Sequence, residues 1–267
     1  MKRAIQRLAL GTCLSLIVGC AAVGKPDTFT FIPDFPPDFT YELKAVYLPA
    51  KGQTCTLAGG RNAQLGFNKI GMKYETTSEI ELYRTVENCP VALNLLEVKI
   101  VGVIGRDSKR SYTTYEFISI AVRHELLEKY KGDFNSEGEG SFSGQCQWLF
   151  RTVGPKRYIT KILDCKKTDT QGNVIRGRPF TAYTLDQLPG KTVRLKITLA
   201  EVERPAIGDT WIKVPGGWKR CMGDNFEDQY AFCYGNHKDF STFKMLDERI
   251  CTIYPGCTEN KEETHEH

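Results

Sequence analysis

The sequence predicts a mainly β protein, with antiparallel sandwich-like or barrel-like sheets in one or two units, stapled by disulfides and ending in a Cys-rich segment. Three observations lead to this fold class: an alternating segment at Thr192–Leu199, two β-prone runs within 146–165, and eight cysteines beyond residue 20. Alternating apolar and polar residues are the pattern of a strand with one buried face. Many short strands joined by turn-rich segments are typical of all-β sandwiches and barrels.

The first 19 residues have the features of an export signal peptide. Three basic residues precede the apolar run Leu8–Val18, which is too short to span a bilayer as a stable helix. The tetrapeptide that ends at Cys20, Ile-Val-Gly-Cys, resembles the lipobox of bacterial lipoproteins. The resemblance covers only residues 1–20, and it implies cleavage before Cys20 and acylation of its sulfur and its new amino group.

The same resemblance implies a location and one partner. Several acyl chains hold a protein stably at a bilayer, so the expected partner is a membrane, reached through the lipid anchor. Ala21 follows the cysteine where retained inner-membrane lipoproteins typically carry Asp, which implies an outer-membrane protein that faces the periplasm. The formal net charge falls from +4 to +1 when the three basic residues leave with the signal. This balance does not favour nucleic acid as a partner.

Residues 20–40 are expected to form the lipid anchor and an extended tether, because 25–40 contains four prolines and four phenylalanines. The phenylalanines are expected to dock on the first sheet. Arg123–Lys131 is the one segment expected to be helical, and it is short. It closes a first β-rich unit at 41–131, whose expected strands are Tyr41–Leu48, Glu79–Thr85, Leu93–Ile104 and Tyr112–Val122.

A hairpin is predicted at the start of a second β unit, 145–205, after a Gly-, Ser- and acid-rich linker or long loop at 132–144. A four-residue loop separates its two strands, so Val153 is expected to face Tyr158. Counting seven residues outward on each strand places Cys146 opposite Cys165. Directly opposed residues of an antiparallel pair lie close enough for a disulfide, so a Cys146–Cys165 bond is predicted.

The segment Thr192–Leu199 alternates without exception. Its apolar members are expected to face the core, and its polar members the solvent. Each buried apolar side chain should contribute about 1.5–3 kcal/mol to folding. The apolar face consists of Val193, Leu195, Ile197 and Leu199.

Eight cysteines remain after the signal and the anchor, and an even number in an exported chain favours disulfides. No two of them are closer than Cys251 and Cys257, so the short spacings of zinc sites are absent and no metal is predicted. The pairing of the last four cysteines stays open among three connectivities. The eight disulfide candidates are Cys55, Cys89, Cys146, Cys165, Cys221, Cys233, Cys251 and Cys257.

The sequence predicts no catalytic residue and no cofactor. His124 and Glu125 resemble the start of the zinc-protease helix motif, but Glu128 occupies the place of the second histidine. Gly190–Thr192 ends like a phosphate-binding loop, but a strand follows where a helix would be needed. In 138–144, Phe142 stands where a nucleophilic serine would be required. We therefore expect a protein that is not an enzyme.

Two interpretations of the Cys- and aromatic-rich segment 206–257 are open. It can be a small region that needs disulfides because it has few regular elements, or a rigid aromatic surface for a partner. The second interpretation makes binding residues of Trp211, Trp218, Tyr230 and Tyr234. The charged tail 258–267 is expected to be disordered.

The leading functional hypothesis is a lipid-anchored periplasmic module that binds another protein, and one form of it is an immunity-type inhibitor of a periplasm-acting toxin. The alternatives are an envelope assembly or cell-wall-binding lipoprotein, and an envelope hydrolase whose site is assembled only by the fold. A deep pocket holding Asp, Glu or His would favour the enzyme. A broad exposed face centred on Trp211 and Trp218 would favour binding.

Overall fold

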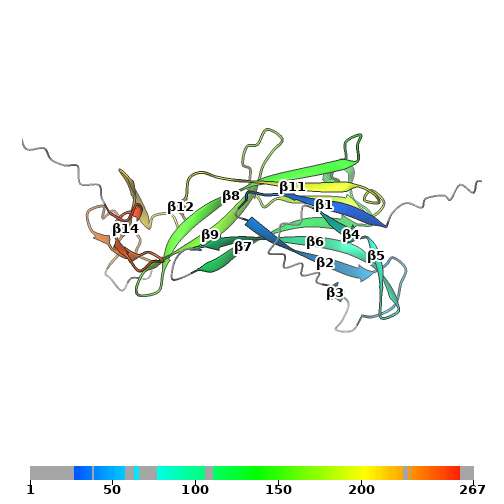
Figure 1. The fold of residues 1–267 in the computed structure, drawn as a ribbon, viewed down its shortest axis with the longest axis horizontal. Helices are drawn as coiled ribbons and strands as arrows, with labels where there is room; N and C mark the ends of the chain where they lie inside the picture. The colour runs from blue at the N-terminus through cyan, green and yellow to red at the C-terminus, as the bar shows by residue number, and fades with distance from the viewer. Residues whose placement is uncertain are drawn as a thin grey trace, which may run out of the picture.

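The structure is a computed structural model that describes residues 27–37, 39–57, 63–65, 77–105, 111–224, 228 and 230–258. Within these ranges the regular structure is nearly all strand, and the one helical element is the 3₁₀ turn η1, Glu128–Tyr130. The molecule is elongated, with two long twisted sheets face to face and a small sheet at one end (Figure 1). The predicted mainly β, disulfide-stapled fold class is confirmed.

The first long sheet joins strands that are far apart in the sequence. β1 lies between β11 and β4, and it runs parallel to β11, which in turn runs parallel to β8. The sequence had not indicated these parallel pairs. Across the sheet the order is β17 (Ile250–Cys251), β16 (Phe243–Lys244), β9 (Tyr158–Lys167), β8 (Glu139–Val153), β11 (Thr192–Leu199), β1 (Thr28–Asp34) and β4 (Ser78–Glu81), with β12 (Arg204–Pro205) beside β8.

The second long sheet is mostly antiparallel. Its centre is the pair β6 and β7, and β10 joins β7 in parallel at one edge. The predicted strand Glu79–Thr85 is divided at the fully buried Leu82, between β4 and β5. The order is β10 (Phe180–Thr184), β7 (Tyr112–Arg123), β6 (Cys89–Ile104), β2 (Phe39–Pro49) and β3 (Ala63–Leu65), with β5 (Tyr83–Val86) also paired to β6.

The main core lies between these two sheets, and alternation along the strands builds it. In β11, Val193, Leu195 and Ile197 are buried as predicted, whereas Leu199 at the strand end is exposed. β2 and β6 contribute their inward residues in the same way, Leu43 and Val98 among them. We call this two-sheet body the sandwich.

The predicted hairpin is confirmed in its register. β8 and β9 pair Val153 with Tyr158 and Cys146 with Cys165, and a disulfide joins the two cysteines. The other six cysteines are also paired, each with the next cysteine along the chain, and this settles the connectivity of the last four that the sequence left open. The three further disulfides are Cys55–Cys89, Cys221–Cys233 and Cys251–Cys257.

Three sequence predictions are corrected by the strand boundaries. The tether predicted at 25–40 contains β1, because Phe29 and Phe31 alternate with polar residues and are fully buried. The helix predicted at Arg123–Lys131 is reduced to η1, which buries no residue, so no packing repays the cost of helix nucleation. The predicted linker 132–144 is strand from Glu139 onward.

The glycines at the start of β8 suggested a linker, but they are required there for close packing. A Cβ atom on Gly140 would lie 2.7 Å from the Tyr183 hydroxyl, and one on Gly144 would lie 2.4 Å from Pro179 Cγ. Glycine within a strand often marks such a close approach. Strands from the predicted units 41–131 and 145–205 also share both sheets, so these ranges do not correspond to separate sheets.

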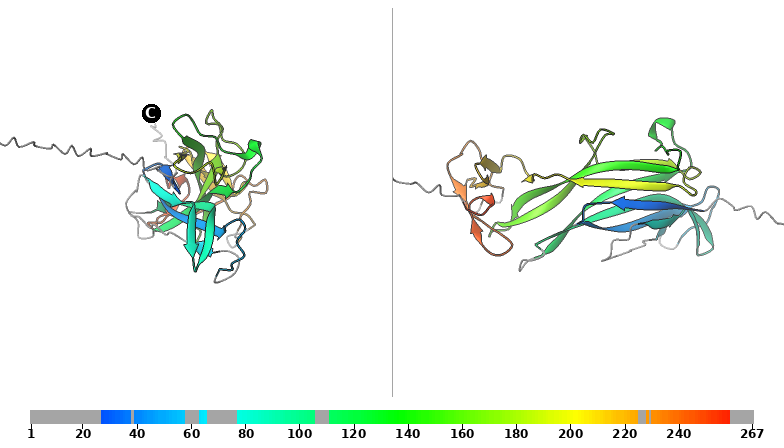
Figure 2. Two further views of the ribbon diagram at one scale, coloured as in Figure 1. Left: turned by 90° about the vertical axis from the view of Figure 1, so that its right-hand side faces the viewer. Right: turned by 45° about the horizontal axis from the view of Figure 1, so that its top comes forward.

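β8 gives the long dimension of the molecule. The starts of β1, β11 and β8 lie side by side, since Thr30 is opposite Thr192 and Thr192 is opposite Glu139. From there β8 continues for 15 residues to Val153, which corresponds to about 45 Å. We call the end at Thr28 the near end and the end beyond Val153 the far end (Figure 2).

The predicted lipidation site Cys20, the predicted signal peptide and nearly all of the predicted tail 258–267 lie outside the described residues. In the part of the chain that the structure describes, no helix is long and apolar enough to cross a membrane.

Candidate binding surface

Residues 206–258 form a small module at the far end, which we call the end module (Figure 1). Its sheet pairs β14 with three short strands, and the first position of β14 requires glycine because β18 approaches it closely. Gly217 has a φ of +150°, and a Cβ atom there would lie 2.0 Å from the Tyr254 carbonyl oxygen. The strands are β13 (Trp211–Val214), β14 (Gly217–Cys221), β15 (Phe240–Ser241) and β18 (Tyr254–Pro255).

The end module packs on the sandwich through aromatic rings. Phe150 of β8 is fully buried, and its ring centroid lies 5.0 Å from that of Trp211 and 4.3 Å from that of Tyr254. Phe243 completes this second core, with its ring centroid 5.2 Å from that of Trp211. Pairs of aromatic rings in edge-to-face or tilted contact stabilise beyond the area that they bury. The end module is therefore docked on the end of β8 and β9.

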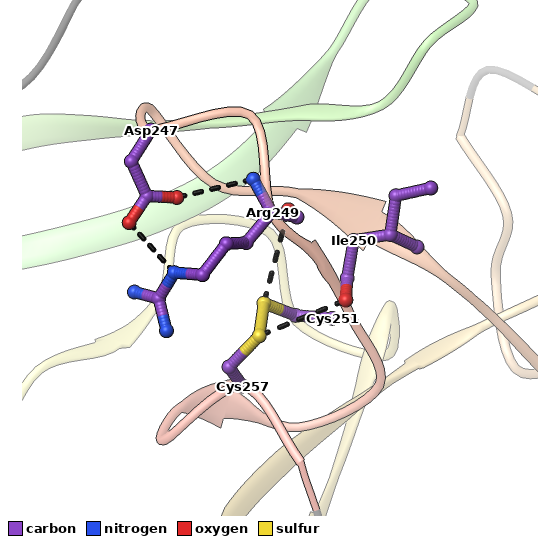
Figure 3. A network of polar contacts seen from close by, with 5 residues as sticks. All are labelled: Asp247, Arg249, Ile250, Cys251 and Cys257. Atoms are coloured by element: carbon purple, nitrogen blue, oxygen red, sulfur yellow. Dashed lines mark hydrogen bonds and ion pairs between the residues drawn. A yellow bond between two sulfur atoms is a disulfide. The ribbon is translucent and has the colours of Figure 1, made fainter.

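A short disulfide loop supports this second core (Figure 3). Cys251 and Cys257 are buried, and Cys257 Sγ lies 3.7 Å from the carbonyl oxygen of Ile250. The turn before the loop is held by Asp247, which accepts bonds of 2.7 Å and 3.1 Å from the Nε and backbone N–H of Arg249. The loop thus holds Tyr254 against Phe150.

Polar groups close the junction between sandwich and end module. Glu203 accepts a hydrogen bond from the Tyr254 hydroxyl and pairs with Lys161 Nζ at 2.5 Å. Lys161 also donates its backbone N–H to the Tyr112 hydroxyl at 2.5 Å. Burial raises the pKa of Tyr254 far above its ordinary value, and the hydrogen bond to Glu203 raises it further. Tyr254 therefore stays a neutral donor.

Two buried arginines hold the chain between Cys221 and Cys233. Arg220 donates from Nη1 to the carbonyl oxygens of Thr210 and Ala231 at 2.7 Å and 2.9 Å, and from Nη2 to that of Tyr230 at 2.9 Å. Arg157 donates from Nη2 to the carbonyl oxygen of Asp228 at 3.3 Å, and from Nη1 to Ser241 Oγ at 2.5 Å. Burial, followed by repulsion from Arg157, lowers the pKa of Arg220 to about 10. Arg220 thus carries its charge at neutral pH and positions Tyr230 and Ala231.

Asp228 fixes the same segment from its other side. Its carboxylate accepts the backbone N–H groups of Tyr230 at 2.9 Å and of Asp224 at 3.3 Å. Backbone hydrogen bonds, that of Ala231 first, lower the pKa of Asp228 below its ordinary value. Together with the Cys221–Cys233 disulfide, these bonds define the path of residues 230–234.

An exposed row of aromatic side chains lies on this fixed segment. We call Tyr230, Phe232 and Tyr234 the aromatic strip. Tyr230 is 58% exposed and Tyr234 is 68% exposed, with the half-buried Phe232 between them. Phe232 stacks on Tyr230 at 6.1 Å and contacts Tyr234 at 5.7 Å. Ala231 and Tyr234 have positive φ angles, a conformation that the surrounding bonds must hold.

The predicted binding residues therefore divide into two groups. Trp211 is only 5% exposed and Trp218 is half-buried, so the expected face centred on these two residues is absent: both pack around Phe150. Tyr230 and Tyr234 are exposed and adjacent. The sequence analysis missed Phe232, although aromatics at every second position around Cys233 were a usable signal. It also missed Arg220, which sequence alone does not distinguish from a surface arginine.

A pocket of about 120 Å³ opens beside the aromatic strip. Tyr230, Arg220, Thr152 and Thr210 are among its lining residues, and none of the described residues that line it is Asp, Glu or His. Across the described residues, no three His, Cys, Asp or Glu side chains gather as a metal site would require. His124 lies exposed between β7 and η1, away from this surface.

Comparison of the chain with known proteins finds no match to a protein family, to a curated protein or to a solved structure.

Proposed function

We propose that this protein is a lipid-anchored component of the bacterial envelope that binds a protein partner in the periplasm through the aromatic strip. The observation that carries the proposal is the exposure of Tyr230 and Tyr234 on a segment fixed by a disulfide and by Arg220. An immunity-type inhibitor is one form of this function, and it stays a prediction.

The rigidity of the aromatic strip supports binding. Ordering a loop on association lowers affinity, and a segment that is already fixed avoids most of that cost. Tyrosine offers a large amphipathic contact area with few rotatable bonds, which is why it is frequent in binding hot spots. Exposed aromatic rings also cost solubility, so their concentration on one rigid segment favours a binding role.

The position of the strip supports the anchored form of the proposal. The chain enters the sandwich at Thr28, at the near end, while the end module lies at the far end, about 45 Å along β8. A protein tied to a bilayer through Cys20 would thus present its aromatic strip away from the membrane surface. The four disulfides agree with an oxidising compartment such as the periplasm.

The proposal is tested first at the anchor. Intact-mass measurement of the protein purified from its own membranes should give a chain that starts at Cys20 and carries acyl groups. An unmodified chain that retains residues 1–19 would contradict the lipid anchor.

Binding is tested by site-specific photo-crosslinking in cells. A photoreactive phenylalanine analogue at Tyr234 should give one discrete crosslinked species. The same analogue at Tyr115, which is 52% exposed on β7, is the matched control and should not give it. Tyr230→Ala should weaken the Tyr234 crosslink, since Tyr230 belongs to the same surface. Identical crosslinks at 234 and 115, or none at 234, would contradict binding through the strip.

A further inference from the structure

A second exposed apolar surface lies at the near end. Leu127 is 66% exposed, Tyr130 is 59% exposed and Phe180 is 56% exposed. Leu127 and Tyr130 belong to the segment around η1, and Phe180 begins the edge strand β10. We call these three residues the near-end patch.

The near-end patch borders a wide, shallow groove. Tyr130, Phe180, Leu126 and Lys129 are among the residues that line it, and its volume is about 460 Å³. The segment is held against β10 by the backbone N–H of Gly132, which donates to the Ala182 carbonyl oxygen at 2.7 Å. The apolar side chains are therefore presented by a supported backbone and not by a free loop.

Hydrogen bonds link this patch to the point where the chain enters the sandwich. Leu185 donates its backbone N–H to the Arg123 carbonyl oxygen at 2.9 Å, just before η1. Five residues later, Gly190 donates its backbone N–H to the Thr28 carbonyl oxygen at 2.8 Å. Figure 2 shows the segment around η1 and the first strand at the same end of the molecule.

Basic side chains flank the apolar ones. Lys129 Nζ lies 4.9 Å from the ring centroid of Tyr130. Lys131 lines the groove and pairs with Glu128 at 2.8 Å, and Lys51 pairs with Glu125 at 3.2 Å. Leucine and aromatic rings beside lysine, which can extend its charge toward water, are typical of surfaces that lie in the bilayer interface. The acidic residues of this segment are paired, so they add little repulsion from an anionic bilayer.

We propose that the near-end patch rests in the interface of the membrane to which Cys20 is tied. Only residues 21–27 separate Cys20 from Thr28, and seven residues span at most about 25 Å. A lipid at Cys20 thus keeps the near end within reach of the bilayer, and the effective concentration of membrane at the patch is high. This inference rests on the lipid anchor of the proposed function, and it makes the membrane contact a second attachment that orients the sandwich.

Fluorescence in vesicles tests the contact. The lipidated protein, which starts at Cys20 and carries Tyr130→Trp, is reconstituted in vesicles of phosphatidylethanolamine and phosphatidylglycerol at 3:1, with and without a brominated phosphatidylcholine. The signal of the parent protein, which has three tryptophans, is subtracted. Tyr115→Trp is the matched control, because Tyr115 is 52% exposed on β7, in the same long sheet as Phe180 of the near-end patch. Quenching of the added tryptophan by bromine should be about threefold or more greater at 130 than at 115.

Two outcomes overturn the inference. Equal quenching at 130 and 115 means that the patch stays in water, and a blue-shifted but unquenched tryptophan at 130 means that a protein surface or a second copy covers it. In both cases the protein still floats with the vesicles if Cys20 is lipidated, and the Tyr234 crosslink is unaffected. Failure here is thus distinct from failure of the anchor or of partner binding.

A second measurement tests the near-end patch without the acyl anchor at Cys20. Protein that begins at residue 20 with Cys20→Ser, and so lacks both the acyl groups and the apolar run of residues 8–18, should bind the same vesicles weakly. Leu127→Ser with Phe180→Ser should lower its partition coefficient about fivefold or more. Both side chains are exposed, so the double substitution should leave the melting temperature unchanged. Unchanged partitioning would contradict the inference.

Discussion

The sandwich and the end module bury different kinds of groups. Among the described residues, the sandwich core is a continuous cluster of 29 buried residues between strands of up to 16 residues. The second core has seven buried residues, and the strands of the end module have only two to five residues each. The end module instead carries two disulfides within 53 residues and the buried Arg220. Long ladders and apolar burial order the sandwich, while covalent bonds and buried hydrogen bonds order the end module.

This difference bears on function, because the aromatic strip lies on the end module, which depends on disulfides and buried hydrogen bonds for its order. A strand pair of two residues cannot hold an exposed loop by its ladder alone. Arg220 and the Cys221–Cys233 disulfide supply that order instead. A fixed binding segment thus needs no large core beneath it.

The largest expected effect comes from removing the ring that joins the two parts. Phe150→Ala should lower the free energy of unfolding by about 4 kcal/mol, because Phe150 is fully buried against Trp211 and Tyr254. Urea unfolding followed by tryptophan fluorescence measures the loss. Val153→Ala on the same strand, at a side chain that is 39% exposed, should cost far less. Equal losses in the two variants would mean that the aromatic junction does not couple the parts.

The second largest effect should come from removing the Cys221–Cys233 disulfide, and the loss of stability should be confined to the end module. Replacing Cys221 and Cys233 by Ala should cost about 3 kcal/mol locally, because the bond closes a loop across 12 positions. Hydrogen exchange of residues 230–234 should accelerate while β6 and β7 keep their protection. Loss of protection in β6 as well would show that the end module and the sandwich unfold as one unit.

A third change tests packing within the sandwich. A Cβ atom on Gly102 would lie 2.4 Å from Trp148 Cη2, whose ring stacks on Phe39. Gly102→Ala should therefore cost about 2 kcal/mol through overpacking. Gly208→Ala is the control in the end module, since nothing lies within 4 Å of its added Cβ atom. Thermal unfolding should separate the two variants, and equal melting temperatures would show that Trp148 moves freely.

The smallest effect concerns a surface ion pair at the near end. A hydrogen bond from Arg194, at 2.7 Å, lowers the pKa of Glu139 below its ordinary value. Because the folded-state pKa is lowered, the pair stabilises the fold above the ordinary pKa of Glu, and this contribution is lost as pH falls through the lowered pKa. Arg194→Gln should raise the pKa of Glu139, as NMR titration measures. The stability difference should be small and should shrink with added salt.

How far the sequence predicts the fold depends on how local each pairing is. The β8–β9 hairpin was predicted to the residue, because a four-residue loop and two opposed cysteines fix its register. The alternation of β11 was equally clear. The partner strands of β11 were not predicted. β1 and β8 pair with β11 in parallel, each from a part of the sequence more than 40 residues away, and no tight turn links them to it.

The candidate site was predicted only in part, for a similar reason. Tyr230 and Tyr234 were identified by residue type, but burial decided against Trp211, and burial depends on Phe150 from a distant strand. Arg220 has its role because three backbone carbonyl oxygens surround it, and a sequence does not reveal which carbonyl groups the fold brings to a side chain. Composition indicated the region, and the tertiary contacts selected the residues.

The parallel arrangement of β1, β11 and β8 has a mechanical consequence. A force that pulls Thr28 away from the near end, and is resisted at Val153 at the far end, runs along the strands and not across them. The backbone bonds between β1 and β11, and between β11 and β8, are then loaded in shear and must rupture together. Such a body transmits tension between its two ends without unzipping strand by strand.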